Sequence, residues 1–468
     1  MFKKFFFYSL LLFAASLKTT SACSQQTLSL QQAIETAVKN YGTIRAKSNY
    51  VKASEQTVIQ SQKEYLPDLN VSFQQDYGTV NGQTGPSYGY RGLSVASSGP
   101  SLASQNWNSA FGALYLANVN WDFFAFGKAK EKIRVAQTAL ERDKNDLGQE
   151  KFQHTIRVSA AYLTVLAAHQ VSRSQQNNLD RSIALRNVVV ARVKNGLNAG
   201  VDSSLANAEV SNSKISLTRA QDYEQEQMNL LAQLMGVPSQ NFMLDTLFLT
   251  QIPPDILDTT QGSQQNHPLL KFYRERINYS NEQAKYYNTF KYPTFSVFGV
   301  MQGKGSGFDY DYGALNKGGF SHDYFDGVNP TRSNYILGVG MIWNLTSPLR
   351  VNRQVEALKY TTKGLQDEYD QLNQNLQNQL ELSDTKIKNA LSNYREAPIQ
   401  VKSASDAYLQ KSVLYKNGLS NIVDVTQALF GLNRAETDRD IAFANVWQAL
   451  LLKAAASGDF SIVLSGLR

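Results

Sequence analysis

The sequence predicts an α+β membrane protein with long α-helices and a transmembrane β-barrel that several chains share. Three observations predict this fold class. One unit occurs twice along the 468 residues. Each copy holds two segments in which apolar and polar side chains alternate, as they do in membrane strands. Each copy also holds about 70 residues before a glycine turn, enough for a helix of about 100 Å at about 1.5 Å per residue.

The composition is moderately polar without being strongly charged. Charged residues make up 18% of the chain, and the mean hydropathy is -0.35. Uncharged polar residues account for the difference, as in segment 372–379, which alternates Asn and Gln with Leu. Helices of this composition suit contact with water on one face and with neighbouring helices on the other.

The first residues have the layout of a secretory signal peptide. Lys3 and Lys4 precede an apolar run over 5–17, and small residues follow up to Ala22. The run is too short to span a bilayer as a helix, so we expect residues 1–22 to be removed. Removal takes away three lysines and lowers the formal charge from +7 to +4. With no basic cluster among aromatic residues, the sequence does not predict a nucleic-acid partner.

Cys23 is the single cysteine, so neither an intrachain disulfide nor a cysteine-based metal site is predicted. It follows Ala22 directly. One interpretation is a lipidated N-terminal cysteine, because small residues precede it, although the Leu usual at the start of a lipoprotein cleavage box is missing. The other is ordinary cleavage that leaves a free cysteine.

The internal repeat organises the chain. The sequence Lys-Asn-Gly-Leu at 194–197 returns at 416–419, a shift of 222 residues (418 − 196). The same shift relates Trp121 to Trp343 and Gly236 to Gly458, whereas upstream a shift of 226 (293 − 67) relates Pro67 to Pro293. We therefore divide the chain into a signal peptide (1–22), a first repeat (23–236), an irregular equatorial linker (237–265), a second repeat (266–458) and a C-terminal tail (459–468).

Two strands are predicted in each repeat. The first repeat alternates over 68–76 and over 110–123, and the second does so around 294–297 and over 334–345. Aromatic residues near the strand ends resemble a membrane girdle: Trp107, Trp121, Tyr292 and Trp343. A soluble sandwich with one buried face is the alternative.

The segments between paired strands, 78–107 and 303–332, are rich in Gly, Ser, Tyr and Asn and are predicted to be long surface loops. The glycines at 303–307 match neither a P-loop nor a dinucleotide fingerprint.

Helix lengths give an independent check on the repeat. The helix that returns from the turn at Gly196 to Gly236 is half as long as the helix before the turn. Segments 30–64 and 266–290 supply the missing halves, so two short helices are expected to stack end to end beside each long one. Pro398 is expected to kink the second long helix, because a proline there removes a hydrogen bond.

Four strands per chain cannot close a membrane barrel, since open edges in lipid leave backbone groups unsatisfied. Several chains must therefore share one barrel. The signal peptide, the duplicated unit, the two strand pairs and the turn motifs Asn195-Gly196 to Asp202 and Asn417-Gly418 to Asp424 resemble the TolC family of outer-membrane efflux proteins. The resemblance covers essentially the whole mature chain.

The resemblance implies a homotrimer in which a long α-helical barrel through the periplasm is continuous with a twelve-stranded transmembrane β-barrel in the bacterial outer membrane, in contact with its lipid. It also implies docking to a periplasmic adaptor (membrane fusion) protein and an inner-membrane pump of RND or ABC type. The chain would be an exit duct for efflux or type I secretion that passively conducts small molecules or exported polypeptides, without cofactors.

The resemblance places a pore constriction at the second helix turn. Asp424 matches one acidic ring, and Gln427 stands where the family has a second acid. Ser420 replaces an arginine that latches the closed state, whereas Tyr415 and Asp202 keep latch-like residue types. The resemblance thus implies weaker cation selectivity and a looser closed state.

The alternative for both Asp202 and Asp424 is a structural role. An acidic side chain in the first turn of a helix is stabilised by the positive end of the helix dipole and can cap free N–H groups. Asn195, Gly196, Asn417 and Gly418 would shape the tips that face the adaptor, the glycines supplying a positive φ.

Two other classes of protein remain as alternatives. For an enzyme, the four histidines (His154, His169, His267 and His322) have no metal-ligand spacing and no nucleophile motif accompanies them, so the sequence predicts no catalytic site. A secreted helical coiled-coil scaffold or adhesin would need sustained heptads, and it leaves the strands unexplained.

Overall fold

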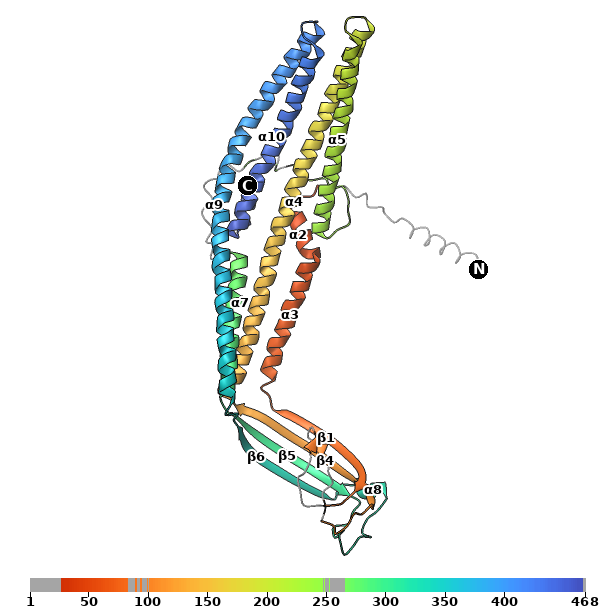
Figure 1. Cartoon of the computed structure of the whole chain (residues 1–468), viewed down its shortest axis with the longest axis vertical. Coiled ribbons are helices and arrows are strands. Elements are labelled where there is room, and N and C mark those ends of the chain that lie inside the picture. Colours follow the sequence, from red (N-terminus) through yellow and green to blue (C-terminus); the bar gives the residue numbers. More distant parts are fainter. Residues whose placement is uncertain are drawn as a thin grey trace, which may run out of the picture. The chain divides into compact units, whose positions relative to one another are not determined.

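The computed structural model describes residues 27–82, 89–90, 93–94, 99, 101–246, 248, 252 and 266–465. The predicted signal peptide and Cys23 lie outside these residues, as does most of the predicted linker. The chain forms two compact units, and each takes segments from both repeats. Unit 1 comprises 1–50, 144–273 and 368–468, and unit 2 comprises 51–143 and 274–367. Figure 1 shows the elements along the chain.

Two long helices run through both units. Helix α4 spans Lys128–Lys194 (67 residues) and α9 spans Ser347–Lys416 (70 residues), which matches the lengths that the sequence predicts. Helix α9 continues through Pro398. In the part of the chain that the structure describes, no helix has both the length and the apolar character needed to cross a membrane.

Unit 1 packs the long helices against α2 (Leu30–Asn40), α5 (Gly200–Met235), α10 (Ile422–Ser457) and α11 (Ser461–Ser465). Helix α2 begins at a capping box, in which Ser29 and Gln32 satisfy each other's backbone N–H groups. The core centres on Tyr162 and Trp447, both fully buried and both in edge-to-face contact with Phe248. The hydroxyl of Tyr162 donates to Leu28 O at 2.8 Å.

The short helices meet end to end at two matching junctions in unit 1. Gly236 ends α5 with φ 65°, and its Cβ position lies 3.0 Å from Asn40 at the end of α2. Gly458 ends α10 with φ 77°, and its Cβ position lies 2.8 Å from the Cα atom of His267, just before α7 (Pro268–Asn288). Only glycine combines a left-handed backbone with so close a neighbour.

Unit 2 contains a four-stranded antiparallel sheet in the order β1-β4-β5-β6. Its strands are β1 (Asp68–Thr79), β4 (Ser109–Phe124), β5 (Thr294–Ser306) and β6 (Arg332–Ile342). A separate small hairpin pairs β2 (Gly89–Tyr90) with β3 (Leu93–Ser94). Among the described residues, β1 and β6 each pair along one side only, so the sheet has two free edges.

One face of the sheet carries exposed apolar side chains. Leu69 and Phe73 on β1 are 73% and 72% exposed, and Tyr335 and Leu337 on β6 are 80% and 77% exposed. Asn70, Ser72 and Gln74 alternate with the β1 residues and therefore point to the other face. A soluble sandwich would bury the apolar face, so these exposures argue against that alternative.

Equivalent tryptophans tie each strand pair to its helices. The indole N–H of Trp121 donates to Tyr65 O at 2.9 Å, and that of Trp343 donates to Lys291 O at 3.0 Å. Tyr65 follows α3 (Gly42–Lys63), and Lys291 ends the 3₁₀ turn Thr289–Lys291 after α7. Trp107 precedes the first residue of β4, Ser109, and is 80% exposed.

The loop prediction for 303–332 was wrong in two places. Strand β5 continues to Ser306, and Tyr324–Val328 forms helix α8. Glycines at 303 and 305 hid the strand, because they lack the side chains that reveal alternation. Five residues are too few to reveal a helical period, although Asp323 caps α8 by accepting from Phe325 N at 2.8 Å.

Candidate functional site

The candidate site consists of the two helix turns of unit 1, at 195–199 and 417–421. Both have the same backbone. Gly196 and Gly418 have φ values of 71° and 78°, and the next residue's N–H returns to the last helical turn at 2.9 Å. These are Schellman turns, in which the left-handed residue lets the chain satisfy the last carbonyl groups of a helix. The Asn-Gly pairs of the sequence therefore lie where the repeat predicts them.

Each turn exposes two equivalent apolar side chains. Leu197 and Val201 are exposed at the first turn, and Leu419 and Val423 at the second. Beneath them a separate cluster of buried side chains fixes the helices to one another: Leu185, Val189, Ala206, Tyr415, Ile422, Val425 and Leu429. The exposed residues are thus held on a rigid base.

Asp424 lies in the first turn of α10 and is doubly held. Its backbone N–H donates to the side chain of Asn421, the N-cap residue, at 2.8 Å. Its Oδ2 atom accepts from Lys411 Nζ and from Ser420 Oγ, each at 3.0 Å. The hydrogen bonds from Lys411 and then Ser420 lower the pKa of the Asp424 carboxyl, because they favour its charged form.

Asp202 lies at the equivalent place on α5 but has different neighbours. The N-cap residue is Ala199, which offers no side-chain cap. The Oδ2 atom of Asp202 accepts from Asn198 Nδ2 at 2.7 Å, and the same amide nitrogen lies 3.3 Å from the Tyr415 hydroxyl. Asn198 therefore joins the first turn to α9.

Arg192, in the last turn of α4, completes this connection. Its Nε donates to Asn198 Oδ1 and its Nη1 to Lys416 O, both at 2.7 Å. Its guanidinium also lies over the Tyr415 ring, 5.5 Å from the centroid. Tyr415 is 1% exposed, and burial followed by the charge of Asp202 raises the pKa of its phenol. The hydroxyl thus stays protonated.

Solved structures of high similarity share this fold. VceC of Vibrio cholerae is 15% identical, with a TM-score of 0.70 over 92% of this chain and 96% of that one. CmeC of Campylobacter jejuni is 12% identical, with a TM-score of 0.71 over 92% and 85%. The open state of MtrE from Neisseria gonorrhoeae is 14% identical, with a TM-score of 0.68 over 92% and 89%. The chain has the fold of the TolC-type outer-membrane channels.

At the level of sequence, no protein-family model and no curated protein matches the chain. The likeness to TolC-type channels is therefore one of fold, and it confirms the predicted combination of long helices with a four-stranded sheet. CmeC and MtrE are outer-membrane channels, and VceC is an outer-membrane protein. Among the described residues, no group of three or more His, Cys, Asp or Glu side chains could hold a metal ion.

The structure brings together only some of the residues that the sequence singles out. Asp202 and Tyr415 meet through Asn198, whereas Ser420 bonds Asp424 at the other turn. Gln427 is exposed one helical turn beyond Asp424. Sequence reasoning missed Arg192, Asn198 and Lys411. A basic residue near a helix C-terminus is common for dipole reasons, so nothing in the pattern marked Arg192 as a link to α9.

Proposed function

We propose that the chain is one protomer of an exit duct in the bacterial outer membrane, through which small molecules or exported polypeptides pass from the periplasm to the outside. The observation that carries the proposal is a sheet with an exposed apolar face and two edges that no described residue pairs with, in a chain of TolC-type fold. Lipid would cover the apolar face. Neighbouring protomers would cover the edges, because backbone groups left unpaired in lipid are costly.

The proposed assembly is a homotrimer. Pairing β1 of one protomer with β6 of the next would close a ring of strands without free edges. Three copies of the four-stranded sheet would supply the twelve strands that the family resemblance implies, above the minimum of about eight for a membrane barrel. The conduction is passive in this proposal, and the pump supplies the energy.

We assign the resting constriction to the second helix turn. Three copies of Asp424 and Gln427 would face the axis, and the Asp424 carboxylates would favour cations. Because Lys411 lies 3.0 Å from each carboxylate, the ring is partly neutralised, so the preference for cations is modest.

The closed state would be held by Arg192 in place of the family arginine that Ser420 replaces. Its bonds to Asn198 and Lys416 and its place over Tyr415 tie α4 to α9 within one protomer. Asp202 belongs to the same network. Opening the tip would require Arg192 and its partners to exchange these hydrogen bonds for hydrogen bonds to water.

The helix-turn tips at Asn195-Gly196 and Asn417-Gly418 are the proposed docking sites for a periplasmic adaptor protein. Leu197, Val201, Leu419 and Val423 offer it exposed apolar contacts at equivalent positions. An inner-membrane pump of RND or ABC type would complete a tripartite efflux or type I secretion system. Lipidation of Cys23, after cleavage of residues 1–22, would add a second membrane anchor.

The test combines the oligomeric state with single-channel recordings of the purified full-length chain in planar bilayers. We expect heat-sensitive trimers in the outer-membrane fraction and steady pores that favour cations weakly. Outer-membrane oligomers that form no pores would overturn the duct and favour a secreted helical scaffold or adhesin. A soluble monomer would overturn the membrane assignment altogether.

A further inference from the structure

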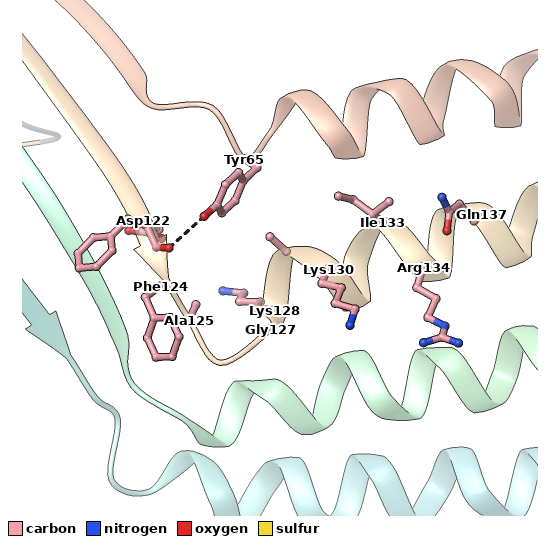
Figure 2. A pocket seen from close by; sticks show the side chains of 12 residues that line it. Tyr65, Asp122, Phe124, Ala125, Gly127, Lys128, Lys130, Ile133, Arg134 and Gln137 are labelled. Carbon is pink, nitrogen blue, oxygen red and sulfur yellow. Dashed lines mark hydrogen bonds between the residues drawn. The ribbon is translucent and has the colours of Figure 1, made fainter.

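A cavity of about 610 Å³ opens in unit 2 where β4 passes into α4. Figure 2 shows it between the end of the strand, Tyr65 and the first turns of the helix. Its apolar walls come from both elements: Phe123, Phe124, Ala125, Ala129 and Ile133. A second cavity of about 370 Å³ adjoins it and shares Tyr65, Asp122, Ala125, Lys128 and Ala129. The site is larger than ordinary packing defects and belongs to neither helix turn.

Basic side chains form one wall of this cavity. Of the seven residues 128–134, four are basic and one is acidic. Lys128, Lys130 and Arg134 line the cavity. Figure 2 shows Lys130 and Arg134 leaving α4 on one side, and Ile133 and Gln137 on the other. The cavity thus combines an apolar wall with a cationic one.

The cations are only partly neutralised by the protein. The Nε atom of Arg134 lies 3.3 Å from Glu282 Oε2. The other oxygen of that carboxylate, Oε1, accepts from Lys285 Nζ at 2.8 Å. Lys128 lies 4.5 Å from the centre of the Phe290 ring. For Lys130, which is exposed, no ion pair or hydrogen bond occurs within the described ranges. Asp122 is the acid of the lining, and its Oδ1 accepts from Ser296 at 2.6 Å.

The apolar wall continues onto the exposed face of the sheet. The Phe124 ring lies 6.1 Å from Phe295 and 4.9 Å from Phe126, and Phe126 stacks on Tyr292 at 5.1 Å. Phe295 pairs with Met341, which belongs to the exposed apolar row of β6 together with Tyr335, Leu337 and Val339. A ligand at this site can therefore lay an apolar chain on the sheet while its head stays beside Lys130 and Arg134.

We propose that this cavity binds the phosphate headgroup of an anionic phospholipid from the periplasmic leaflet. This inference rests on the proposed function, which places the apolar sheet in a membrane. The phosphate would lie between Lys130 and the Nη atoms of Arg134, which make no ion pair with the described residues, and the first acyl carbons would lie on Phe124. A free phosphate ion would leave the apolar wall unused, and a zwitterionic lipid such as phosphatidylcholine would bring its own quaternary ammonium close to the cations.

The test measures lipid binding by the full-length oligomer in detergent micelles doped with phosphatidylglycerol or with phosphatidylcholine. The variant is Lys130→Gln/Arg134→Gln. Lys359→Gln/Lys363→Gln is the matched control, because these exposed lysines have the same spacing on α9. Removing one cation beside an anionic surface weakens attraction by roughly fivefold, so the double variant should bind phosphatidylglycerol roughly twenty-fivefold more weakly. The control should bind as the wild type does.

Three outcomes would overturn the inference. They are equal binding of both lipids by the wild type, equal loss in the control, and displacement of phosphatidylglycerol by millimolar inorganic phosphate, which would make the site one for the free ion. Planar-bilayer recordings on the same preparations separate this inference from the proposed function. Pores without selective lipid binding would reject the lipid site alone, whereas an absence of pores would reject the duct.

Discussion

The two helix turns share a backbone but differ in every side chain that holds them. At the second turn Asn421 caps α10, and Asp424 is bonded to Lys411 and Ser420 from its own helix pair. At the first turn Ala199 gives no cap, and Asp202 is held by Asn198, which Arg192 and Tyr415 join to α9. Duplication thus preserved the turn and its aspartate, while the side chains that bond the aspartate diverged. The second turn is held by side chains of its own helix pair, whereas the first turn is hydrogen-bonded to α9.

Arg192→Gln should give the largest effect, because it breaks the tie between the turns. It removes the charged hydrogen bonds to Asn198 and Lys416, and such bonds contribute about 1.5–3 kcal/mol each when intact. We expect the resting conductance in planar bilayers to rise at least tenfold, since about 1.4 kcal/mol shifts a two-state equilibrium tenfold and one such bond alone contributes about that much.

Arg186→Gln is the matched control, since Arg186 bonds the adjacent Asn187. It should leave the conductance unchanged. A resting conductance of Arg192→Gln equal to that of the control would mean that the closed state is held elsewhere.

Asp424→Ala should lower cation selectivity more than Asp202→Ala, if the second turn forms the constriction. The pKa of the Asp424 carboxyl lies below its usual value of about 3.9, so the group stays charged until the pH falls below that value. Wild-type selectivity should therefore persist to about pH 4 and be lost below it.

Lys411→Gln provides the matching titration. It removes the largest cause of the lowered pKa, so the selectivity should begin to fall at a higher pH than in the wild type. Identical pH profiles for wild type and Lys411→Gln would show that Asp424 does not face the ion path and acts as a helix-terminal acid.

The sequence was sufficient to predict the turns and the places of the four long strands because their patterns are local, although glycines hid the end of β5. Asn-Gly pairs predict left-handed turns, and alternation over 68–76 identifies a strand by its period. The network around Arg192 was not predictable in this way, because its contact with Tyr415 joins residues from different repeats. The hydrogen bond from Arg192 to Asn198 spans the first turn. Other residues hold the second turn, so comparison of the two repeats did not predict this bond.

Exchanging the N-cap residues should change the stability of the two turns in opposite directions. Asn421→Ala removes the bond to Asp424 N and should destabilise by about 1 kcal/mol. Ala199→Asn adds a cap where none exists and should stabilise by up to about 1 kcal/mol. Thermal unfolding of the oligomer, followed by circular dichroism at fixed protein concentration, measures both. Equal and small effects would mean that α10 begins without help from Asn421.

The smallest difference is expected between Gly196→Ala and Gly418→Ala. Each substitution forces an L-residue into a left-handed conformation and should destabilise by about 1–2 kcal/mol. Space does not distinguish them, because a Cβ atom at Gly196 meets nothing within 4 Å and one at Gly418 meets only Arg192 Nη2, at 3.7 Å. Gly458→Ala, where the Cβ position lies 2.8 Å from His267 Cα, should cost more than either. Equal losses at the two turns in thermal unfolding would place their whole difference in the side chains, whereas unequal losses would show that their backbones had diverged as well.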